Sequence, residues 1–512
     1  MKDDQEEESP AALTRREALA RGGVLLGGAL SPLPATAAPA SAPSELCFKS
    51  AVELAQLIQK RELLATDVLA AHLRQIERVN SKVNAICTLV ADAAREQAER
   101  ADLALRRNEP VGPLHGLPIA IKDLVATKGI RTTYGSRIYK DLVPDQDDLV
   151  AERIRAAGAV ILGKSNTPEF GAGSQTFNEV FGETRNPWDL TKTCGGSSGG
   201  GAVSLACGMT PIADGSDLGG SLRNPPSFCN VVGLRPSPGR VPDWPENLAW
   251  NTLSVSGPMG RSAEDVALLL SALAGPDPRC PIALDEPGEV FRRPLARSFK
   301  GTRVAWSRNL GRYPVEPRVN AVCDAVRGVF AQLGCTVEDA EPDFKDADEI
   351  FQTLRAWQFA LGHEAHLRDH RDLLKDTVIW NTEAGLRLSG LDVAHAEAKR
   401  AALYERVRLF MDRYDFLMLP VSQVAPFPLE VRWVHEIAGV PLKTYIQWMA
   451  SCYCITLTGL PAASVPAGFT PEGLPVGLQI VGRHHHDFEV LQMAHAFEQA
   501  TGFGRRRPPA AS

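Results

Sequence analysis

The ordered pattern of hydrophobic and polar positions begins near residue 50 with two amphipathic segments. In "SAVELAQLIQKREL", Ser50 and Glu53 have the spacing of a capping box, and the leucines and isoleucine that follow fall on one helical face. A second helix is predicted from Thr66, where apolar residues recur at three-to-four spacing. Both segments therefore predict helices that pack one face against a core.

Strand patterns alternate with helical ones further along the chain. "LHGLPIAIKD", residues 114–123, is an apolar run of strand type that ends in Lys122 and Asp123. "DDLVAERIRAAGAVILGKSN" predicts a helix that stops at Gly158 and a buried strand over residues 159–163. A short helix over residues 202–207 and a strand in "PIADGSD" follow.

The second half of the chain continues this alternation. Residues 280–410 are mostly helical in pattern and more highly charged, and the section from "DFLMLPV" onward has three strand-like runs and a final helix. Alternating helices and strands predict an α/β fold with a central sheet covered by helices. Because no internal repeat or clean linker interrupts the pattern, we expect one large domain over residues 43–512.

Composition and charge exclude several classes of protein. The 512 residues are 44% hydrophobic and 23% charged, as in soluble globular proteins, and the net charge is -6. The longest basic run is Arg505–Arg507, so nucleic-acid binding has no electrostatic support. The ten cysteines include no C-x-x-C pair, and Cys452 and Cys454 lack the spacing of zinc ligands. We therefore expect no metal site.

The N-terminal segment resembles a twin-arginine export signal. In "TRREALARGGVLLGGALSPLPATAAPASA", Arg15 and Arg16 precede a short apolar stretch and then small residues suited to cleavage. The apolar stretch is too short to span a membrane. The acidic leader "DDQEEE" and Ala18, where an aromatic residue is usual, depart from the signal's common pattern. We expect residues 1–42 to be a signal and leader and the protein to be periplasmic or secreted, with a cytoplasmic location as the alternative.

The stretch "KTCGGSSGGGAVSLACG", residues 192–208, is the strongest candidate for chemistry, because glycines around two serines indicate a sharp bend or a close approach of the backbone. A P-loop is excluded, since no lysine follows these glycines before residue 300. Residues 195–199 match the nucleophile elbow G-x-S-x-G, with His484–His486 as candidate bases. However, "NPWDLTKTC" before the motif is turn-like, whereas an elbow follows a strand.

Separate motifs together indicate a third kind of serine site. They are "GLPIAIKD" at 116–123, "GGSSGGG" at 195–201, "DGSDLGGSLRNP" at 214–225 with "GLRPSPGRV" after it, and "LTGLPAASVPAG" with "GLPVGLQIVG" near the end. In this order and spacing they resemble the amidase signature family of serine amidohydrolases, over about residues 50–503. The resemblance implies a single α/β/α domain with a large mixed sheet. It also implies hydrolysis of a small-molecule amide without a cofactor, and it is compatible with a homodimer.

The resemblance assigns a Ser-Ser-Lys relay. Ser221 is expected to be the nucleophile, Ser197 to pass protons between Ser221 and Lys122, and Lys122 to act as the base and later as the acid. The bond from Gly196 to Ser197 is expected to be cis. A lysine with an ordinary pKa is almost fully protonated at neutral pH, so Lys122 must be buried for its pKa to fall.

The same resemblance assigns the residues around the relay. The backbone N–H groups of Leu218, Gly219 and Gly220, with that of Ser221, are expected to form the oxyanion hole. Ser198 and Asp217 are expected to orient the lysine and the loop.

Two positions depart from the family's pattern, and one arginine has an expected structural role. Cys194 stands where proline is common, and Ser216 stands where threonine is usual. We expect neither to touch the triad. Arg223 is expected to form a structural ion pair rather than to bind a substrate carboxylate.

Three alternatives remain open. The first is the A-type subunit of a glutamine amidotransferase, which the export signal opposes because that complex is cytosolic. The second is a Ser-His-Asp esterase of the α/β-hydrolase type. The third is a non-catalytic binding protein on this fold, which the intact Lys-Ser-Ser set opposes. The substrate cannot be inferred, although Trp244 and Trp250 suggest an apolar rim to its pocket.

Overall fold

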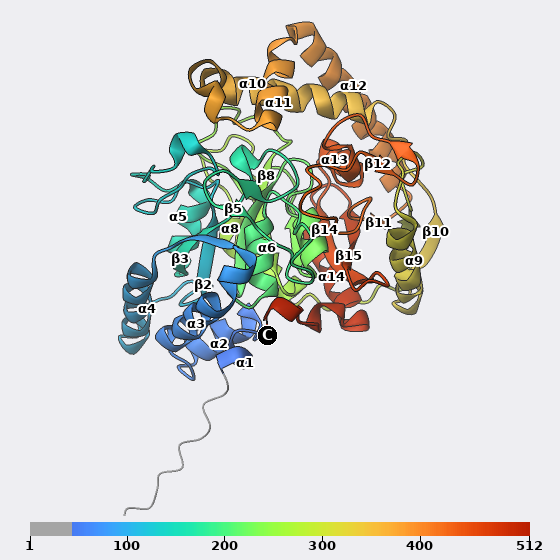
Figure 1. The fold of residues 1–512 in the computed structure, drawn as a ribbon. Coiled ribbons are helices and arrows are strands. Elements are labelled where there is room, and N and C mark those ends of the chain that lie inside the picture. The colour runs from blue at the N-terminus through green and yellow to red at the C-terminus, as the bar shows by residue number, and fades with distance from the viewer. Residues whose placement is uncertain (1–42, 512) are drawn as a thin grey trace, which may run out of the picture. The chain divides into compact units, whose positions relative to one another are not determined.

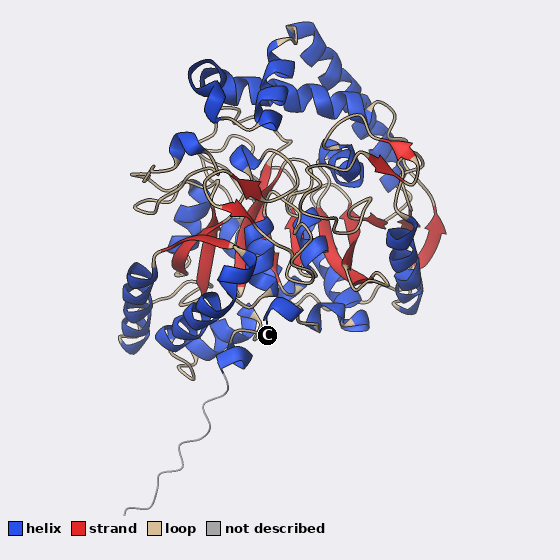
Figure 2. Cartoon of the chain, in the orientation of Figure 1, coloured by secondary structure: helices blue, strands red, loops and turns tan. Residues whose placement is uncertain are grey.

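An eight-stranded mixed sheet lies at the middle of the unit Ala42–Ser512 (Figures 1 and 2). The computed structural model describes residues 43–511, and the predicted export signal lies outside them. From one edge to the other, the strands are β10 (Thr336–Asp339), β9 (Arg303–Trp306), β11 (Phe416–Pro420), β15 (Pro475–Gly482), β14 (Ala462–Phe469), β7 (Val232–Arg235), β8 (Val255–Gly260) and β6 (Ile212–Asp217). The pairs β10–β9 and β9–β11 are parallel, and the pairs from β11 to β6 are antiparallel.

Smaller sheets complete the strand structure of the described residues. A three-stranded sheet has the order β1 (Ile86–Leu89), β3 (Val160–Ser165) and β2 (Pro118–Lys122), with β2 and β3 parallel. Two short hairpins pair β4 (Phe177–Asn178) with β5 (Gly182–Glu183) and β12 (Glu436–Ile437) with β13 (Val440–Pro441). The backbone N–H of Lys122 donates to the side-chain oxygen Oδ1 of Asp214 at 2.9 Å, and this hydrogen bond connects β2 to β6.

Helices surround the strands, and α10, α11 and α12 form a layer at the top of Figure 1. The helices are α1 (Pro43–Leu46), α2 (Ala51–Gln59), α3 (Ala65–Val83), α4 (Ala91–Arg106), α5 (Leu149–Ala156), α6 (Gly199–Ala206), α7 (Asn224–Cys229), α8 (Ala263–Leu273), α9 (Pro317–Gln332), α10 (Ala347–His370), α11 (Asp376–Leu386), α12 (Gly390–Met411), α13 (Ala450–Thr458) and α14 (Asp487–Thr501). Among residues 43–511, no helix is both long and apolar enough to cross a membrane.

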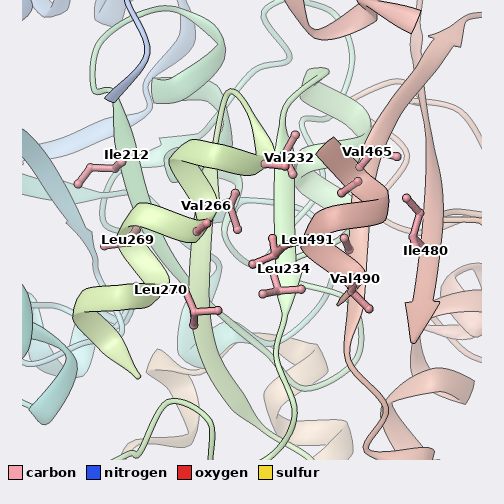
Figure 3. Close-up of a cluster of buried hydrophobic side chains, with 14 of the residues drawn as sticks. Ile212, Val232, Leu234, Val266, Leu269, Leu270, Val465, Ile480, Val490 and Leu491 are labelled. Atoms are coloured by element: carbon pink, nitrogen blue, oxygen red, sulfur yellow. The ribbon is translucent and has the colours of Figure 1, made fainter. Parts of the chain in front are cut away.

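The largest part of the core lies between α8, α14 and the sheet. Figure 3 shows their buried side chains: Ile212 of β6, Val232 and Leu234 of β7, Val465 of β14, Ile480 of β15, Val266, Leu269 and Leu270 of α8, and Val490 and Leu491 of α14. Each fully buried side chain of this size stabilises the fold by about 1.5–3 kcal/mol relative to an exposed one. This packing holds the strands that carry the site in fixed positions.

The predicted α/β class and mixed central sheet are confirmed, as are the two helices predicted near residues 50 and 66, which are α2 and α3. Ser50 caps α2, with its Oγ accepting from Glu53 N–H at 3.0 Å. The helix after the glycine stretch begins at Gly199, earlier than the predicted residue 202. Glycines disfavour helix interiors, so the pattern predicted a loop there. Close packing accounts for them, since a methyl group on Gly200 would lie 2.3 Å from the backbone nitrogen of Asn166.

Gly233 of β7 supports the loop that carries Ser221, and its replacement tests that contact. A methyl group at Gly233 would lie 2.1 Å from the carbonyl oxygen of Leu222. We expect Gly233→Ala to destabilise the protein by about 1–3 kcal/mol through overpacking, and to lower both Tm and hydrolytic activity.

Gly328, inside α9, is the matched control, because a methyl group there would meet no atom within 4 Å. Gly328→Ala should leave Tm unchanged or raise it, because alanine is the better helix former. Equal Tm values for Gly233→Ala and the unmodified protein, measured at one scan rate, would contradict the packing described.

Candidate active site

Lys122 stands at the end of β2 with its ammonium group buried among hydroxyls. All five residues of β2 are buried, and the Lys122 side chain is 0% exposed. Its Nζ donates to Ser197 Oγ at 2.8 Å, to Ser198 Oγ at 2.9 Å and to Ser216 Oγ at 3.0 Å. No carboxylate of the described residues lies within ion-pair distance, that is 4.0 Å, of this ammonium.

This environment lowers the pKa of Lys122. Burial away from water disfavours the ammonium and lowers the pKa to about 7, while the charges of Asp214 and Asp217 oppose the shift. A large fraction of the amine is therefore neutral near neutral pH. A neutral amine with three hydroxyl neighbours can accept a proton from one of them.

The serine segment reaches Lys122 through a close approach of two loops. The peptide bond Gly196–Ser197 is cis, as expected. A methyl group on Gly196 would lie 2.8 Å from the backbone nitrogen of Gln175, so only glycine fits at this approach. Ser197 is 4% exposed and Ser198 is 1% exposed.

Asp217 holds the loop that carries Ser221. Its Oδ1 accepts from Gly220 N–H at 2.8 Å, and its Oδ2 accepts from Leu222 N–H at 3.1 Å. Arg223 and Arg235 donate to the same carboxylate at 2.9 Å and 3.2 Å. Burial would raise the pKa of Asp217, but the two guanidinium groups outweigh it and hold that pKa well below its usual range.

Arg223 has the structural role expected of it. Its five N–H donors are all used, two by Asp217 and the others by Cys452 O, Gln479 Oε1 and Thr456 Oγ1. The side chain is 0% exposed. It therefore has no donor left for a substrate.

The N–H groups near Ser221 differ in what they already bind. That of Gly220 donates to Asp217 Oδ1 at 2.8 Å, so the carboxylate that anchors the loop sets its direction, and its place in an oxyanion hole stays a prediction. Within residues 43–511, no intramolecular acceptor is found for the N–H groups of Leu218 and Gly219. Ser221 itself is 8% exposed, and the role of these two N–H groups as oxyanion donors stays a prediction.

One sequence expectation about the relay is wrong. Ser216 was expected to lie apart from the triad, but it accepts a hydrogen bond from Lys122. Asp214, which positions the Lys122 backbone, was missed altogether. Asp214 and Ser216 are two residues apart on β6, so their side chains lie on the same face of the strand. This two-residue spacing could have identified both as residues near the lysine.

The sequence candidates outside the relay lie elsewhere. No hydrogen bond of the described residues joins His484–His486 to Ser197 or Ser221; His484 instead contacts the ring of Tyr404, at 5.9 Å between centroids. No strand leads directly into the glycine motif either, because β5 ends at Glu183 and the next described element is α6, so the elbow interpretation lacks its strand and its base. Burial raises the pKa of the Cys194 thiol to about 12, which leaves it a poor nucleophile.

Two cavities lie beside the serine loops. One, of about 240 Å³, is lined by Phe170 and Leu218 among others. The other, of about 460 Å³, is lined by Ser174 and Gln175, next to Gly196. Val241 and Leu248, from the segment that holds the suggested rim, line the first cavity. Trp244 and Trp250 line neither cavity: Trp250 is 76% exposed, and the Trp244 ring lies under the guanidinium of Arg279.

Among residues 43–511, no group of three or more His, Cys, Asp and Glu side chains could hold a metal ion. All ten cysteines are free thiols.

Comparisons with known proteins agree with one another. The family model described as Amidase matches residues 67–491. An acylamidase of Rhodococcus erythropolis is 35% identical over 90% of this chain and 98% of its own length. The A subunit of a glutamyl-tRNA(Gln) amidotransferase from Moorella thermoacetica is 36% identical over 91% of this chain and 99% of its own.

Solved structures give the same result. A bacterial aryl acylamidase of the amidase signature family superposes with a TM-score of 0.85 at 29% identity, covering 90% of this chain and 97% of that one. A 6-aminohexanoate cyclic dimer hydrolase superposes with a TM-score of 0.82 at 27% identity, covering 91% of this chain and 100% of that one.

The low pKa of Lys122 predicts how Ser221 reacts with a serine-directed covalent reagent. Only the neutral amine can accept a proton, so the labelling rate should fall about tenfold per pH unit below pH 7 and level off above it. Lys122→Ala should slow labelling by about 100-fold or more, because the base is removed.

The matched control replaces His484, His485 and His486 with alanine, and it should leave the labelling rate unchanged. Mass spectrometry identifies the modified residue in each variant. Slow labelling only in the histidine variant would overturn the role of Lys122.

Proposed function

We propose that this chain, which belongs to the amidase family and is an amide hydrolase, works through an acyl-enzyme formed on Ser221. The observation that carries the proposal is the buried Lys122 amine, which has three serine hydroxyls and no carboxylate as direct partners. Such a lysine serves as a base near neutral pH, and Ser197 is the hydroxyl that links it to the nucleophile.

In the first half of the reaction, Ser221 Oγ attacks the amide carbonyl carbon. Its proton passes to Ser197 Oγ as the proton of Ser197 passes to Lys122 Nζ. The N–H groups of Leu218 and Gly219 stabilise the oxyanion, a contribution of about 3–4 kcal/mol for one donor. The tetrahedral intermediate then collapses, and the proton returns through Ser197 to the leaving nitrogen.

In the second half, water attacks the ester on Ser221. The same relay takes a proton from the water and returns it to Ser221 Oγ as the carboxylic acid leaves. Ser198 and Ser216 keep the Lys122 side chain in place, and Asp217 fixes the loop; none of the three takes up or releases a proton in these steps.

For the substrate, we favour an acyl amide of an alkyl or aryl amine. Similarity to an acylamidase and to an aryl acylamidase supports this choice. Equal similarity to A subunits of glutamyl-tRNA(Gln) amidotransferases supports glutamine as the second candidate. The isolated chain distinguishes them, because anilide hydrolysis and glutamine hydrolysis are measured separately.

We also propose that residues 1–42 direct export by the twin-arginine route. The support is the sequence alone: Arg15 and Arg16, the short apolar stretch and the small residues after it. A protein exported in this way would meet its amide outside the cytoplasm.

Ser221→Ala should abolish hydrolysis of a simple anilide, with kcat falling about 10⁴-fold or more, because no acyl-enzyme can form. Ser197→Ala should lose about 10²–10⁴-fold through the broken relay. The circular dichroism spectrum and Tm should stay unchanged in both, which separates lost chemistry from lost folding. Near-normal turnover by folded Ser221→Ala would refute the mechanism.

Replacing Arg15 and Arg16 with lysines should leave the precursor in the cytoplasm, because the export receptor reads the arginine pair directly. Fractionation of cells that express the full chain measures this, and Arg21→Lys, outside the pair, is the control. Unchanged recovery outside the cytoplasm would remove the export proposal without affecting the chemistry.

A further inference from the structure

The cavity of about 460 Å³ has a cation in its wall that the reaction does not use. Lys375, the residue before α11, lines it, and its Nζ lies 3.9 Å from the centroid of the Phe177 ring. The guanidinium of Arg432 lies 4.4 Å from the same ring centroid. Two like charges beside one ring repel each other, and an anion bound near both would reduce that repulsion.

Lys375 is held in place from both ends. Its backbone N–H donates to Glu169 Oε2 at 2.7 Å, and its Nζ donates to Ala172 O at 3.1 Å. The ammonium has three donors, and the described residues satisfy only this one by hydrogen bonding. The remaining donors are available to a ligand in the cavity.

The segment of residues 171–175 connects the cavity wall to the surroundings of the catalytic serines. A methyl group on Gly171 would lie 3.5 Å from Ser197 Oγ. Further along, Ser174 hydrogen-bonds Met449, and a methyl group on Gly219 would lie 3.3 Å from Met449 Cε. Ser174 of the cavity wall therefore belongs to a segment that approaches Ser197 at Gly171 and reaches the neighbourhood of Gly219 through Met449.

Glu169 is the acid that acts most on Lys375, since its charge opposes the lowering of the Lys375 pKa by burial. Its oxygens accept from Ser136 Oγ–H at 2.6 Å and from the Lys375 backbone N–H at 2.7 Å, not from the ammonium. Among residues 43–511, no carboxylate oxygen lies within 4.0 Å of Lys375 Nζ. Glu179 and Asp376 also line the cavity, but they are exposed to solvent.

Arg432 and Arg137 add positive charge to the wall of the cavity, which favours an anionic ligand there. The Nη1 of Arg432 forms an ion pair of 2.9 Å with Glu183, which does not line the cavity. Among the described residues, no carboxylate pairs with the other nitrogens of the Arg432 guanidinium. Arg137 lines the cavity too, and its buried Nε has no hydrogen-bond partner among the described residues.

We propose that this cavity binds a carboxylate carried by the amide substrate, with Lys375 as its main partner and Arg432 beside it. The inference deepens the proposed function and rests on it, since it makes the preferred substrate an amide with an anionic end. The aromatic walls, Phe177, Trp433 and Trp448, suit the apolar part between that end and the scissile bond.

Two pairs of amides test the proposal, each comparing a carboxylate with a methyl ketone of similar size. Glutaric monoanilide and the anilide of 5-oxohexanoic acid place the group in the acyl part. 4-Acetamidobenzoate and 4-acetamidoacetophenone place it in the amine part. The measured quantity is the ratio of kcat/KM for the carboxylate to kcat/KM for the ketone.

In at least one pair, the ratio should exceed 1 for the unmodified protein and fall about tenfold or more in Lys375→Met, because a charge-assisted hydrogen bond is lost. Lys375→Arg should restore most of it, and Arg432→Met should reduce it. Lys140→Met, at an exposed lysine outside the cavity, is the control and should leave the ratio unchanged. An unchanged ratio in Lys375→Met, or a ratio of 1 or less in both pairs, would overturn the proposal.

A binding measurement separates this inference from the proposed function. Calorimetry with Ser221→Ala and glutaric monoanilide or 4-acetamidobenzoate needs no turnover, and adding Lys375→Met should weaken binding about tenfold. If no amide is hydrolysed but this loss of binding is seen, the proposed function fails and the carboxylate site stands. If the amides are hydrolysed but Lys375→Met does not weaken binding, the proposed function stands and the carboxylate site is refuted.

Discussion

The burial of one lysine amine is the constraint on which the site depends. A shift of the Lys122 pKa from 10.5 to about 7 corresponds to a cost on the order of 5 kcal/mol for the charged form. Because the folded pKa lies below the unfolded one, folding bears the whole cost below about pH 7 and none above the pKa of a free lysine. The packed sheet and the helices around it must offset that cost at neutral pH. A lysine on the surface would not reduce the free energy of unfolding in this way, but its ordinary pKa would keep it protonated at neutral pH and unable to accept a proton.

Lys122 and Asp217 are both buried, but their surroundings act on their charges in opposite ways. Lys122 meets only hydroxyls, which hydrogen-bond the amine in either protonation state and so leave it free to titrate. Asp217 meets two guanidinium groups, which hold it ionised and immobile. A buried ion pair adds little net stability, but losing one partner is costly, so such a pair fixes geometry well. One charge is kept variable for chemistry, and the other is kept constant to hold the nucleophile loop.

Much of this was predictable from the sequence, and the exceptions share a cause. Strand and helix periodicity located β2, β3 and β6, and the spaced motifs identified Lys122, Ser197 and Ser221 as candidates. The direction of the Gly220 N–H was not predictable, because a peptide plane turns toward whichever acceptor the fold supplies. The contact from Lys375 to Glu169 joins residues far apart in the chain, and no local pattern encodes it.

The glycines around the serines illustrate the same distinction. Their number suggested a phosphate cradle or a strained elbow, both of which use glycine for a ligand or a bend. In the fold they allow backbones to touch: Gly196 meets the loop at Gln175, and Gly200 meets Asn166. Both contacts press the serine segment against the strands and loops around Lys122. The same loop continues to Ala172 and holds Lys375, so the contact that assembles the relay also positions the cation proposed to recognise the substrate.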